Sequence, residues 1–393
     1  MISLTLLFTI SVCIAITLIF LGVNIPIALL LAMLLYSVPT LGKDLIPTVF
    51  SSFNMNMLNT VLSLMFALLL ANLFKSKAIS DQLVSSFQSI GIRIATVAIP
   101  AIIGLLPMPA GAYISATMVE PIYRKLGLDR EKSTYINFWL RHIWLAVWPL
   151  YQGIILASGI LKKTSIEIIS WTWPIALASL IAGIIVVSLI VPKETGEEGC
   201  RKNFRGLIHI WPFLLVALLT FSGLQLVFLS VLITIVIFVI IYRVSFRELM
   251  TSLRKSIDYS LIGLVVVSLV FGDVLAITGL SNQLVGYLMG DYKYVLMPLV
   301  PLFIVLATGF EFTFVVLTFP ALQPLLSGPG LTLAYLGGYL GAMLSPSHAC
   351  LVMSAKYFNA SLPRVYKYLI PSAALTAIIT VLFIFAANHV FMV

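Results

Sequence analysis

Long apolar stretches divide the chain into ten predicted membrane spans. A helix needs about 20 apolar residues to cross a bilayer, and stretches of about this length recur from one end of the chain to the other. They cover residues 3–21, 25–42, 57–74, 133–160, 168–191, 207–222, 224–242, 258–276, 331–355 and 368–392. The pattern predicts an all-α integral membrane protein with about ten transmembrane helices.

Two further apolar segments fit neither one crossing nor two. Residues 94–123 and 294–326 are interrupted near their middles by "PMPAGA" and "ATGFEFT". Because two crossings need about 40 residues, each segment is predicted to be a re-entrant hairpin, over about 92–123 and 294–326. Non-helical backbone at that depth requires protein or water around it, so both hairpin tips are candidate sites.

The charges of the loops favour this topology. Lys and Arg accumulate on the cytoplasmic side of membrane proteins. With both hairpins re-entering, one side carries 18 Lys and Arg and the other carries four, whereas single crossings divide them 13 to 9. The favoured topology places both termini outside a cell (plasma) membrane.

The same topology predicts an inverted repeat. Its halves are 1–192 and 207–393, each with five spans and one hairpin, joined by a hydrophilic cytoplasmic linker at 193–206. At a constant offset of 201 residues, "ISDQLV" (79–84) matches "LSNQLV" (280–285). The two halves would enter the membrane from opposite sides.

One span in each half contains a proline break, at "VWPLYQG" (147–153) and "MLSPSHA" (343–349). Proline removes a backbone donor and frees carbonyls. Helix N-termini at such breaks attract anions and unwound carbonyls accept cations. The candidate substrate- and ion-binding residues therefore come from the breaks and hairpin tips: Pro107, Pro109, Gly111, Asn137, Arg141, Trp148, Gln152, Thr308, Gly309, Glu311, Thr313, Ser345, Ser347 and His348.

Two charged candidates are costly at the membrane centre, by about 2.5 to 3.5 kcal/mol each. Glu311 is the one charged residue between Pro301 and Pro320, and it is interpreted as a buried proton carrier or as a protonated cap of the hairpin turn. Arg141 would bind a carboxylate bidentately or extend its side chain to the membrane interface.

The remaining polar residues have structural alternatives. His348 is either a site residue or a packing histidine. For Asp273, a hydrogen bond within the scaffold is favoured over a site role, and an ion pair with Arg124 four residues later is favoured for Glu120. Trp148 is a candidate pocket wall.

Composition excludes several function classes. The chain is 61% hydrophobic and 9% charged with a net charge of +9, but the basic residues lie in short loops where they orient helices, so nucleic acid is not an expected partner. Three widely spaced cysteines predict neither a disulfide framework nor a metal site. There is no nucleotide-binding G-x-x-x-x-G-K-[ST] loop and no H-E-x-x-H metal motif, so no cofactor is expected.

Paired hairpins, each followed by a broken span, resemble the ion transporter superfamily. The segments "PMPAGAYISATMVEPIYRKLG" (107–127) and "GAMLSPSHACLVMSAKYFN" (341–359) resemble its domain of unknown function 401 (DUF401) family. The resemblance implies a homodimer working as an elevator, with a scaffold at 1–90 and 207–291 and a transport region at 92–192 and 294–393. The Ser-Asn-Thr tip motif of sodium-coupled divalent-anion carriers is missing from both tips, so the resemblance does not extend to sodium coupling or a dicarboxylate substrate.

The sequence therefore predicts a secondary active transporter, and not an enzyme. It would move a small anionic solute, a carboxylate, by alternating access, coupled to H+ or Na+. One alternative is a cation/proton antiporter using Glu311 and Asp273 as ion carriers. The other is a polytopic membrane enzyme that uses Glu311 and His348 on a lipid-soluble substrate.

Overall fold

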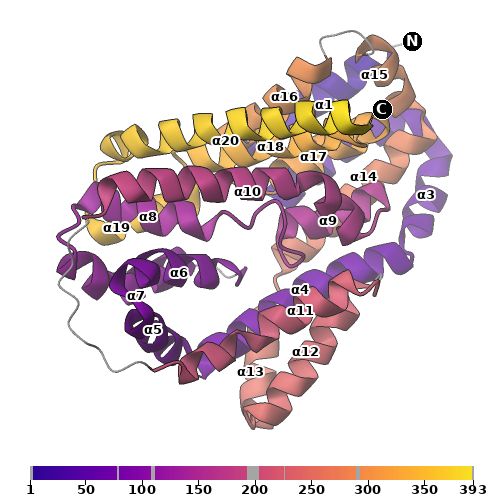
Figure 1. Ribbon diagram of the computed structural model, residues 1–393. Helices are drawn as coiled ribbons and strands as arrows, with labels where there is room; N and C mark the ends of the chain where they lie inside the picture. Colours follow the sequence, from indigo (N-terminus) through magenta and orange to yellow (C-terminus); the bar gives the residue numbers. More distant parts are fainter. Residues whose placement is uncertain are drawn as a thin grey trace. The chain divides into compact units, whose positions relative to one another are not determined.

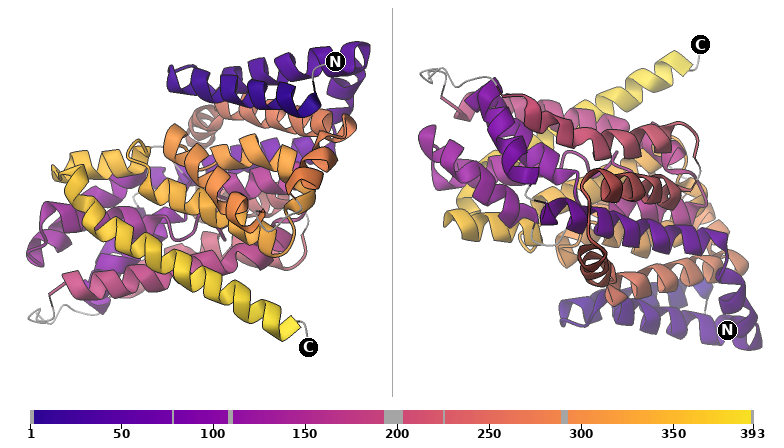
Figure 2. Two further views of the ribbon diagram at one scale, coloured as in Figure 1. Left: turned by 90° about the horizontal axis from the view of Figure 1, so that it is seen from above. Right: turned by 90° about the horizontal axis from the view of Figure 1, so that it is seen from below.

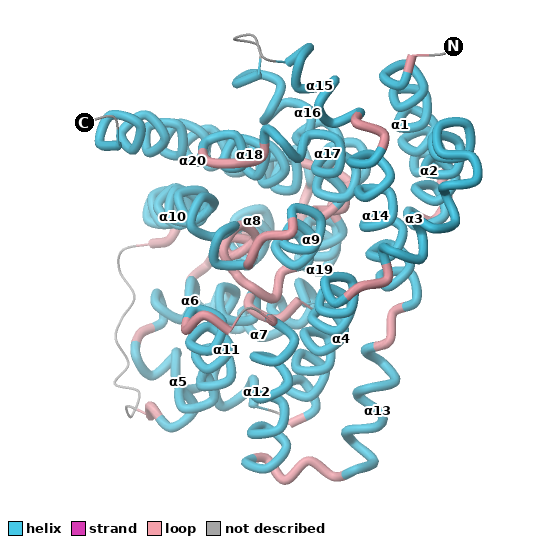
Figure 3. Tube along the Cα trace, turned by 90° about the vertical axis from the view of Figure 1, so that its right-hand side faces the viewer, coloured by secondary structure: helices cyan, strands magenta, loops and turns pink. Residues whose placement is uncertain are grey.

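The structure is a computed structural model and describes residues 3–77, 79–107, 111–192, 203–224, 226–288 and 293–391. Every regular element in these ranges is a helix (Figure 3). Five helices in this part of the chain are long and apolar enough to cross a membrane, namely Ile25–Ser52, Met55–Ser76, Ser165–Ile190, Tyr259–Ile277 and Leu362–Ala386. The chain is thus an all-helical membrane protein. Other predicted spans correspond to shorter helices, so the count of ten crossings stays a prediction.

The two halves of the chain have the same order of elements. The first half contains α1 (Leu4–Phe20), α2 (Ile25–Leu41), η1 (Gly42–Asp44), α3 (Leu45–Ser52), α4 (Met55–Ser76), α5 (Ile79–Ile90), α6 (Ile92–Gly104), α7 (Gly111–Lys125), α8 (Arg130–Arg141), α9 (Gln152–Leu161) and α10 (Ser165–Ile190). The second contains η2 (Arg205–Ile210), α11 (Trp211–Phe221), α12 (Val227–Ile241), α13 (Phe246–Ser256), α14 (Tyr259–Ile277), α15 (Leu280–Leu288), α16 (Lys293–Thr308), α17 (Thr313–Leu322), η3 (Gln323–Leu325), α18 (Pro329–Leu344), α19 (Ala349–Phe358) and α20 (Leu362–Phe391). Elements α2 to α10 recur as α12 to α20 at close to the offset of 201 residues. The opposite orientation of the halves in the membrane stays a prediction.

The chain folds as two compact units that each draw on both halves. Unit 1 comprises Met1–Met65, Gln152–Thr172 and Ile257–Ser345, and unit 2 comprises Phe66–Tyr151, Trp173–Ser256 and Pro346–Val393. Unit 1 thus contains α1 to α3 and α9 with α14 to α18, and unit 2 contains the counterparts α11 to α13 and α19 with α5 to α8. The predicted scaffold and transport regions are defined by movement, so they stay a prediction.

In unit 1, α14 packs against α2, α3 and α17, and α1 packs against α2 (Figure 2). Helix α16 packs against both α17 and α18. The backbones of α16 and α18 approach closely. A Cβ atom on Gly337 would overlap the carbonyl of Pro298, and one on Gly341 would lie 2.7 Å from the Leu302 carbonyl oxygen. Small residues at this spacing let two membrane helices touch through their backbones.

In unit 2, α6 packs against α5, α7 and α8, and α19 packs against α7 and α8 (Figure 1). Helix α11 packs against α12, where Phe238 lies fully buried. Helix α20 packs against α8, and the Tyr135 hydroxyl of α8 lies 2.6 Å from the Ser372 hydroxyl of α20. These contacts fix the helices that surround the end of α8.

Both segments predicted as hairpins are pairs of short helices. Helix α6 packs against α7, and α16 packs against α17, across breaks at 105–110 and 309–312. These helices have 10 to 16 residues. At 1.5 Å per residue, none covers a bilayer core of about 30 Å. Neither segment is one continuous span, and the return of each hairpin to the side it came from stays a prediction.

Three sequence interpretations differ from the structure. Helices α5, α13 and α15 lie between the predicted spans and hairpins, where no helix was predicted. Helix α13 begins at a capping box in which the Ser245 N–H donates to Glu248 Oε2 (2.8 Å) and the Glu248 N–H donates to Ser245 Oγ (3.2 Å), a signal readable as S-x-x-E. The predicted span 207–222 is divided between a 3-10 helix and α11. The first proline break begins at His142, five residues earlier than the predicted 147.

Candidate functional site

Arg141 ends α8 and lies inside unit 2, only 3% exposed. Its Nη1 donates a long hydrogen bond of 3.5 Å to the Ile103 carbonyl at the end of α6. A Cβ atom on Gly111, the first residue of α7, would lie 2.6 Å from both Nη1 and Nη2. A side chain at position 111 would therefore displace the end of the Arg141 guanidinium. The structure therefore places Arg141, buried, against the end of α6 and the start of α7.

The backbone at the end of α8 also approaches α6. A Cβ atom on Gly104 would overlap the Arg141 carbonyl. Tyr151 donates from its hydroxyl to the carbonyls of Gly104 (2.8 Å) and Arg141 (3.3 Å), and Trp144 Nε1 donates to the Ala101 carbonyl (2.7 Å). Side chains of the break thus satisfy carbonyls at the ends of α6 and α8. This explains why α8 ends before the proline.

Two buried side-chain donors of α8 and the following break have no hydrogen-bond partner in the described part of the chain. The first N–H groups of α7 have no partner within a helix, and the N-terminus carries a partial positive charge. Arg141 Nε and Trp148 Nε1 are both buried and have no hydrogen-bond partner among the described residues. Trp148 itself packs on Phe213, with 6.3 Å between ring centroids. Pro107 is half-buried before the tip, and Pro109 lies outside the described residues.

Asn137 connects three helices next to this region. Its Oδ1 accepts from Ser115 Oγ of α7 at 2.6 Å, and its Nδ2 donates to the Ala112 carbonyl at 3.0 Å and to Ser354 Oγ of α19 at 2.9 Å. Both ends of the amide are therefore bound to protein. The geometry supports a positioning role for Asn137.

The tip of the second hairpin, in unit 1, is closed by two threonines. The hydroxyls of Thr308 and Thr313 lie 2.6 Å apart, and Thr313 also donates to the Phe310 carbonyl at 2.7 Å. Gly309 has φ 73°, which favours glycine. Glu311 is half-buried in this turn, so the expectation of full burial was wrong. The residues between the two threonines, 309–312, lie outside the helices.

The second proline break joins the two units. Ser345 is buried and donates to the Leu306 carbonyl of α16 at 3.2 Å, whereas Ser347 is exposed and His348 is buried. Gln152 begins α9 and is half-buried. Ser345 and Glu311 belong to unit 1, and Ser347 and His348 belong to unit 2. The pocket predicted to unite them stays a prediction.

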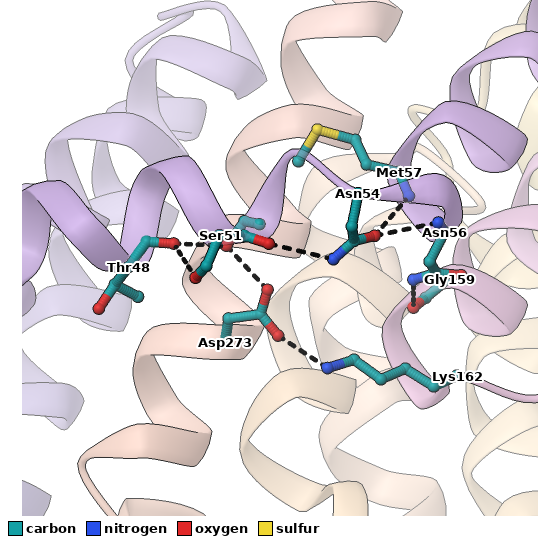
Figure 4. Close-up of polar contacts among 9 residues, drawn as sticks. Thr48, Ser51, Asn54, Asn56, Met57, Gly159, Lys162 and Asp273 are labelled. Carbon is teal, nitrogen blue, oxygen red and sulfur yellow. Dashed lines mark hydrogen bonds and ion pairs between the residues drawn. The ribbon is translucent and has the colours of Figure 1, made fainter.

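Asp273 lies in a second polar cluster of unit 1, at the start of α4 and the ends of α3, α9 and α14. Its carboxylate accepts from Ser52 Oγ (2.8 Å) and from Lys162 Nζ (3.0 Å), as Figure 4 shows for Lys162. Asn56 Nδ2 donates to the Gly159 carbonyl at 2.7 Å. These residues line a cavity of about 70 Å³. The predicted structural hydrogen bond of Asp273 is confirmed, and its ion pair with Lys162 was not foreseen.

The predicted ion pair between Glu120 and Arg124 is also confirmed. Its Oε1 lies 2.6 Å from Arg124 Nη2, one turn later in α7. Glu120 Oε2 additionally accepts from the Tyr357 hydroxyl at 2.6 Å. This pair belongs to the exterior of α7, since the side chain of Arg124 is 79% exposed.

Sequence reasoning missed a cluster of possible metal ligands. His142, His348 and Cys350 each offer one ligand atom, and these atoms lie within 4.8 Å of one another. The cysteines had been given no role. The only local signal was His348-x-Cys350 inside the second break, together with a histidine at the start of the first break.

Comparisons with known proteins identify the fold and the family. No curated protein matches the chain. A solved structure, described as "Crystal structure of the Alcanivorax borkumensis YdaH transporter reveals an unusual topology", is 16% identical with a TM-score of 0.58, over 90% of this chain and 89% of that chain. At this identity the likeness shows the fold of a membrane transporter. The family model "Protein of unknown function (DUF401)" matches residues 1–386, so the chain belongs to the DUF401 family, as the motifs of its hairpin and break predicted.

Proposed function

We propose that the chain is a secondary active transporter that moves a small carboxylate by alternating access. One observation carries this proposal: a buried arginine lies at the N-terminus of α7 with its Nε unpartnered among the described residues. The transporter fold shared with the YdaH structure is consistent with it.

An anion relieves an unfavourable arrangement at this place. A buried guanidinium next to the positive end of a helix combines two positive potentials in a region of low dielectric constant. Leaving a buried charged donor unsatisfied costs about 1 to 3 kcal/mol or more. A carboxylate bound to Arg141 would accept two parallel N–H bonds from the planar fork, and further bonds from the N-terminus of α7. The match in charge and shape favours carboxylates over neutral solutes.

Coupling to protons is proposed through Glu311. Glu311 lies half-buried in the turn between α16 and α17, and in the proposed carrier water would reach it from either side. A group of this kind at a moving hairpin tip takes up a proton on one side and releases it on the other. Na+ coupling through unwound carbonyls is the second choice. The transport region, scaffold and homodimer implied by the ion transporter superfamily complete this proposal.

The two alternatives receive less support. In a cation/proton antiporter Asp273 would carry the ion, but its carboxylate is already neutralised by Lys162 and hydrogen-bonded to Ser52. A membrane enzyme acting through Glu311 and His348 is not favoured by a fold that resembles a transporter.

Thermal stabilisation of the purified full chain tests the anion site. Melting temperatures would be measured with succinate, citrate, gluconate and benzoate, and with sodium and lithium chloride as the cation arm. We expect at least one carboxylate to stabilise the wild type and Arg124→Lys, an exposed matched control, but not Arg141→Lys, because a point charge cannot replace a planar fork. Stabilisation by sodium or lithium alone, equal in all three proteins, would instead favour the antiporter.

A stabilising carboxylate then becomes the probe for transport. Proteoliposomes with an imposed pH gradient should accumulate the labelled compound, and dissipating the gradient should stop accumulation. Uptake that ignores the pH gradient but follows a sodium gradient would contradict proton coupling while leaving the anion site intact.

A further inference from the structure

Three side chains with metal-binding atoms meet where α8 ends and α19 begins, within unit 2. His142 follows α8, His348 precedes α19, and Cys350 is the second residue of α19. Both histidines are buried and Cys350 is half-buried. We propose that His142, His348 and Cys350 bind a soft or borderline metal ion, Cu+ or Zn2+. This site is separate from the proposed carboxylate transport and does not depend on it.

The hydrogen bond of His142 prepares its ring for a metal. Nδ1 lies 2.6 Å from the Phe138 carbonyl oxygen. A carbonyl only accepts, so Nδ1 carries the proton and Nε2 keeps its lone pair. Metal-bound histidines characteristically donate their other ring N–H in this way, which fixes the tautomer and the orientation of the ring.

Packing holds the two imidazoles close together. The Phe138 ring centroid lies 4.6 Å from that of His142 and 5.5 Å from that of His348, and the two imidazole centroids lie 5.1 Å apart. The Asn137 bond to Ser354 fixes the end of α8 against α19. These packing contacts orient the two histidines before an ion arrives.

The distances require a modest closure. Metal–nitrogen and metal–sulfur bonds of about 2.0 to 2.3 Å place ligand atoms roughly 3.3 to 3.8 Å apart, inside the 4.8 Å limit within which these atoms lie. Rotation of the half-buried Cys350 side chain supplies this movement. Its exposure also gives an ion a way in.

Charge and ligand type favour Cu+ over Zn2+. Cys350 lies in the first turn of α19, where the helix N-terminus stabilises a thiolate. One thiolate and two neutral imidazoles give a neutral site with Cu+ but a positive one with Zn2+, directly after Arg141 in the chain. A net charge is disfavoured away from water, and thiolate is a preferred ligand of Cu+.

Metal titration of the full chain in detergent tests the proposal. After chelator treatment under reducing conditions, the protein would be titrated with Co2+, a spectroscopic substitute for Zn2+, and with Cu+ against a chromophoric chelator. We expect one ion per chain and a thiolate-to-cobalt charge-transfer band. Cys350→Ser should remove this band, and Cys350→Ser, His142→Gln and His348→Gln should each weaken binding by more than about 100-fold, beyond the effect of losing an outer-shell partner.

Matched controls separate ligation from damage to the fold. Cys13→Ser, in exposed α1, and His209→Gln, whose ring contacts Tyr242, should bind as the wild type does. In the unsubstituted protein, Cu+ should protect Cys350 but not Cys13 from maleimide, with the labelled peptides identified by mass spectrometry. Equal labelling of Cys350 with and without the ion, or an unchanged cobalt spectrum in Cys350→Ser, would overturn the proposal.

Discussion

Units 1 and 2 contain equivalent helices but fill the junction between hairpin and broken span in opposite ways. In unit 2 the two hairpin positions next to the break are Gly104 and Gly111, and the large residue is Arg141 on α8. At the offset of 201, unit 1 has Val305, Phe312 and Ala342. Where unit 2 has two small residues and one large residue, unit 1 has two large residues and one small residue. The repeat thus preserves the order of the helices. The large side chains at the junction, however, come from different elements in the two units.

The charged residues follow the same asymmetry. Glu311 at the second tip corresponds to Ala110 in the first half, and Arg141 corresponds to an alanine. Asp273 corresponds to Asn72, which donates to Ser256 Oγ at 3.0 Å just as Asp273 accepts from Ser52. Each unit keeps the hydrogen bond, and only one has the charge. A duplicated fold therefore provides one basic junction and one acidic tip, the two features that the proposed carrier uses.

Placing an arginine at Ala342, the counterpart of Arg141 in unit 1, should have the largest effect. Ala342 is 1% exposed, and α18 there packs closely on α16. Ala342→Arg would bury an unpaired charge without the space that glycines provide in unit 2, at a cost of about 3 to 5 kcal/mol. We expect little folded protein by size-exclusion chromatography, with Ala342→Ser as a mild control. A well-folded Ala342→Arg protein would show that the junctions are interchangeable.

Removing the acid from the tip of unit 1 should abolish coupling without affecting the fold. Glu311→Gln imitates the protonated carboxyl and makes this tip uncharged like the other. Accumulation driven by a pH gradient should be lost in proteoliposomes, whereas carboxylate binding and exchange persist. Undiminished accumulation by the Gln variant would make Glu311 a structural cap.

Adding one methyl group to unit 2 should separate binding from stability. In Gly111→Ala the new Cβ displaces the end of the Arg141 side chain, which is flexible, so the helix packing changes little. We expect affinity for the stabilising carboxylate to fall about tenfold, or about 1.4 kcal/mol, as measured by titration. The matched control is Gly153→Ala in α9, where nothing lies within 4 Å. Equal affinities in the two variants would argue against a guanidinium contact.

Making Asp273 resemble Asn72 should have the smallest effect. Asp273→Asn loses the ion pair to Lys162, whose side chain is 60% exposed, but can keep the bond from Ser52. Pairs of this kind contribute about 0 to 1 kcal/mol, so the melting temperature should fall by only a few degrees and less at high salt. Loss of transport at unchanged stability would make Asp273 an ion carrier and revive the antiporter.

Segment length and proline position gave the sequence analysis its correct results. Segment length and the polar interruptions predicted that neither hairpin segment is one continuous helix, and the prolines predicted that α8 and α18 are interrupted; the re-entry of the hairpins stays a prediction. The capping box at Ser245 shows that α13 was equally readable and was overlooked. The family was identified from the residues of the segments that contain Pro107 and Ser345.

The site chemistry depended on contacts that local patterns do not encode. The role of Gly111 is apparent only once Arg141 is seen to occupy its side-chain space. Likewise, His142 and Cys350 come from opposite halves of the chain and meet because α8 packs on α19. Glu311 was expected to be buried from its apolar neighbours, but a turn directs successive side chains to different surroundings.

If the proposed transport is correct, the position of Arg141, with its backbone against Gly104 and its guanidinium against Gly111, would make this side chain part of the permeability barrier. If it were truncated, the vacated volume would be bounded by the Ile103 carbonyl and the N-terminus of α7. Polar cavities of this kind fill with water, and a chain of water molecules conducts protons. An Arg141→Ala protein would therefore leak protons as well as bind carboxylate poorly. In the proposed transporter, the residue that recognises the solute would then also prevent dissipation of the gradient that drives transport.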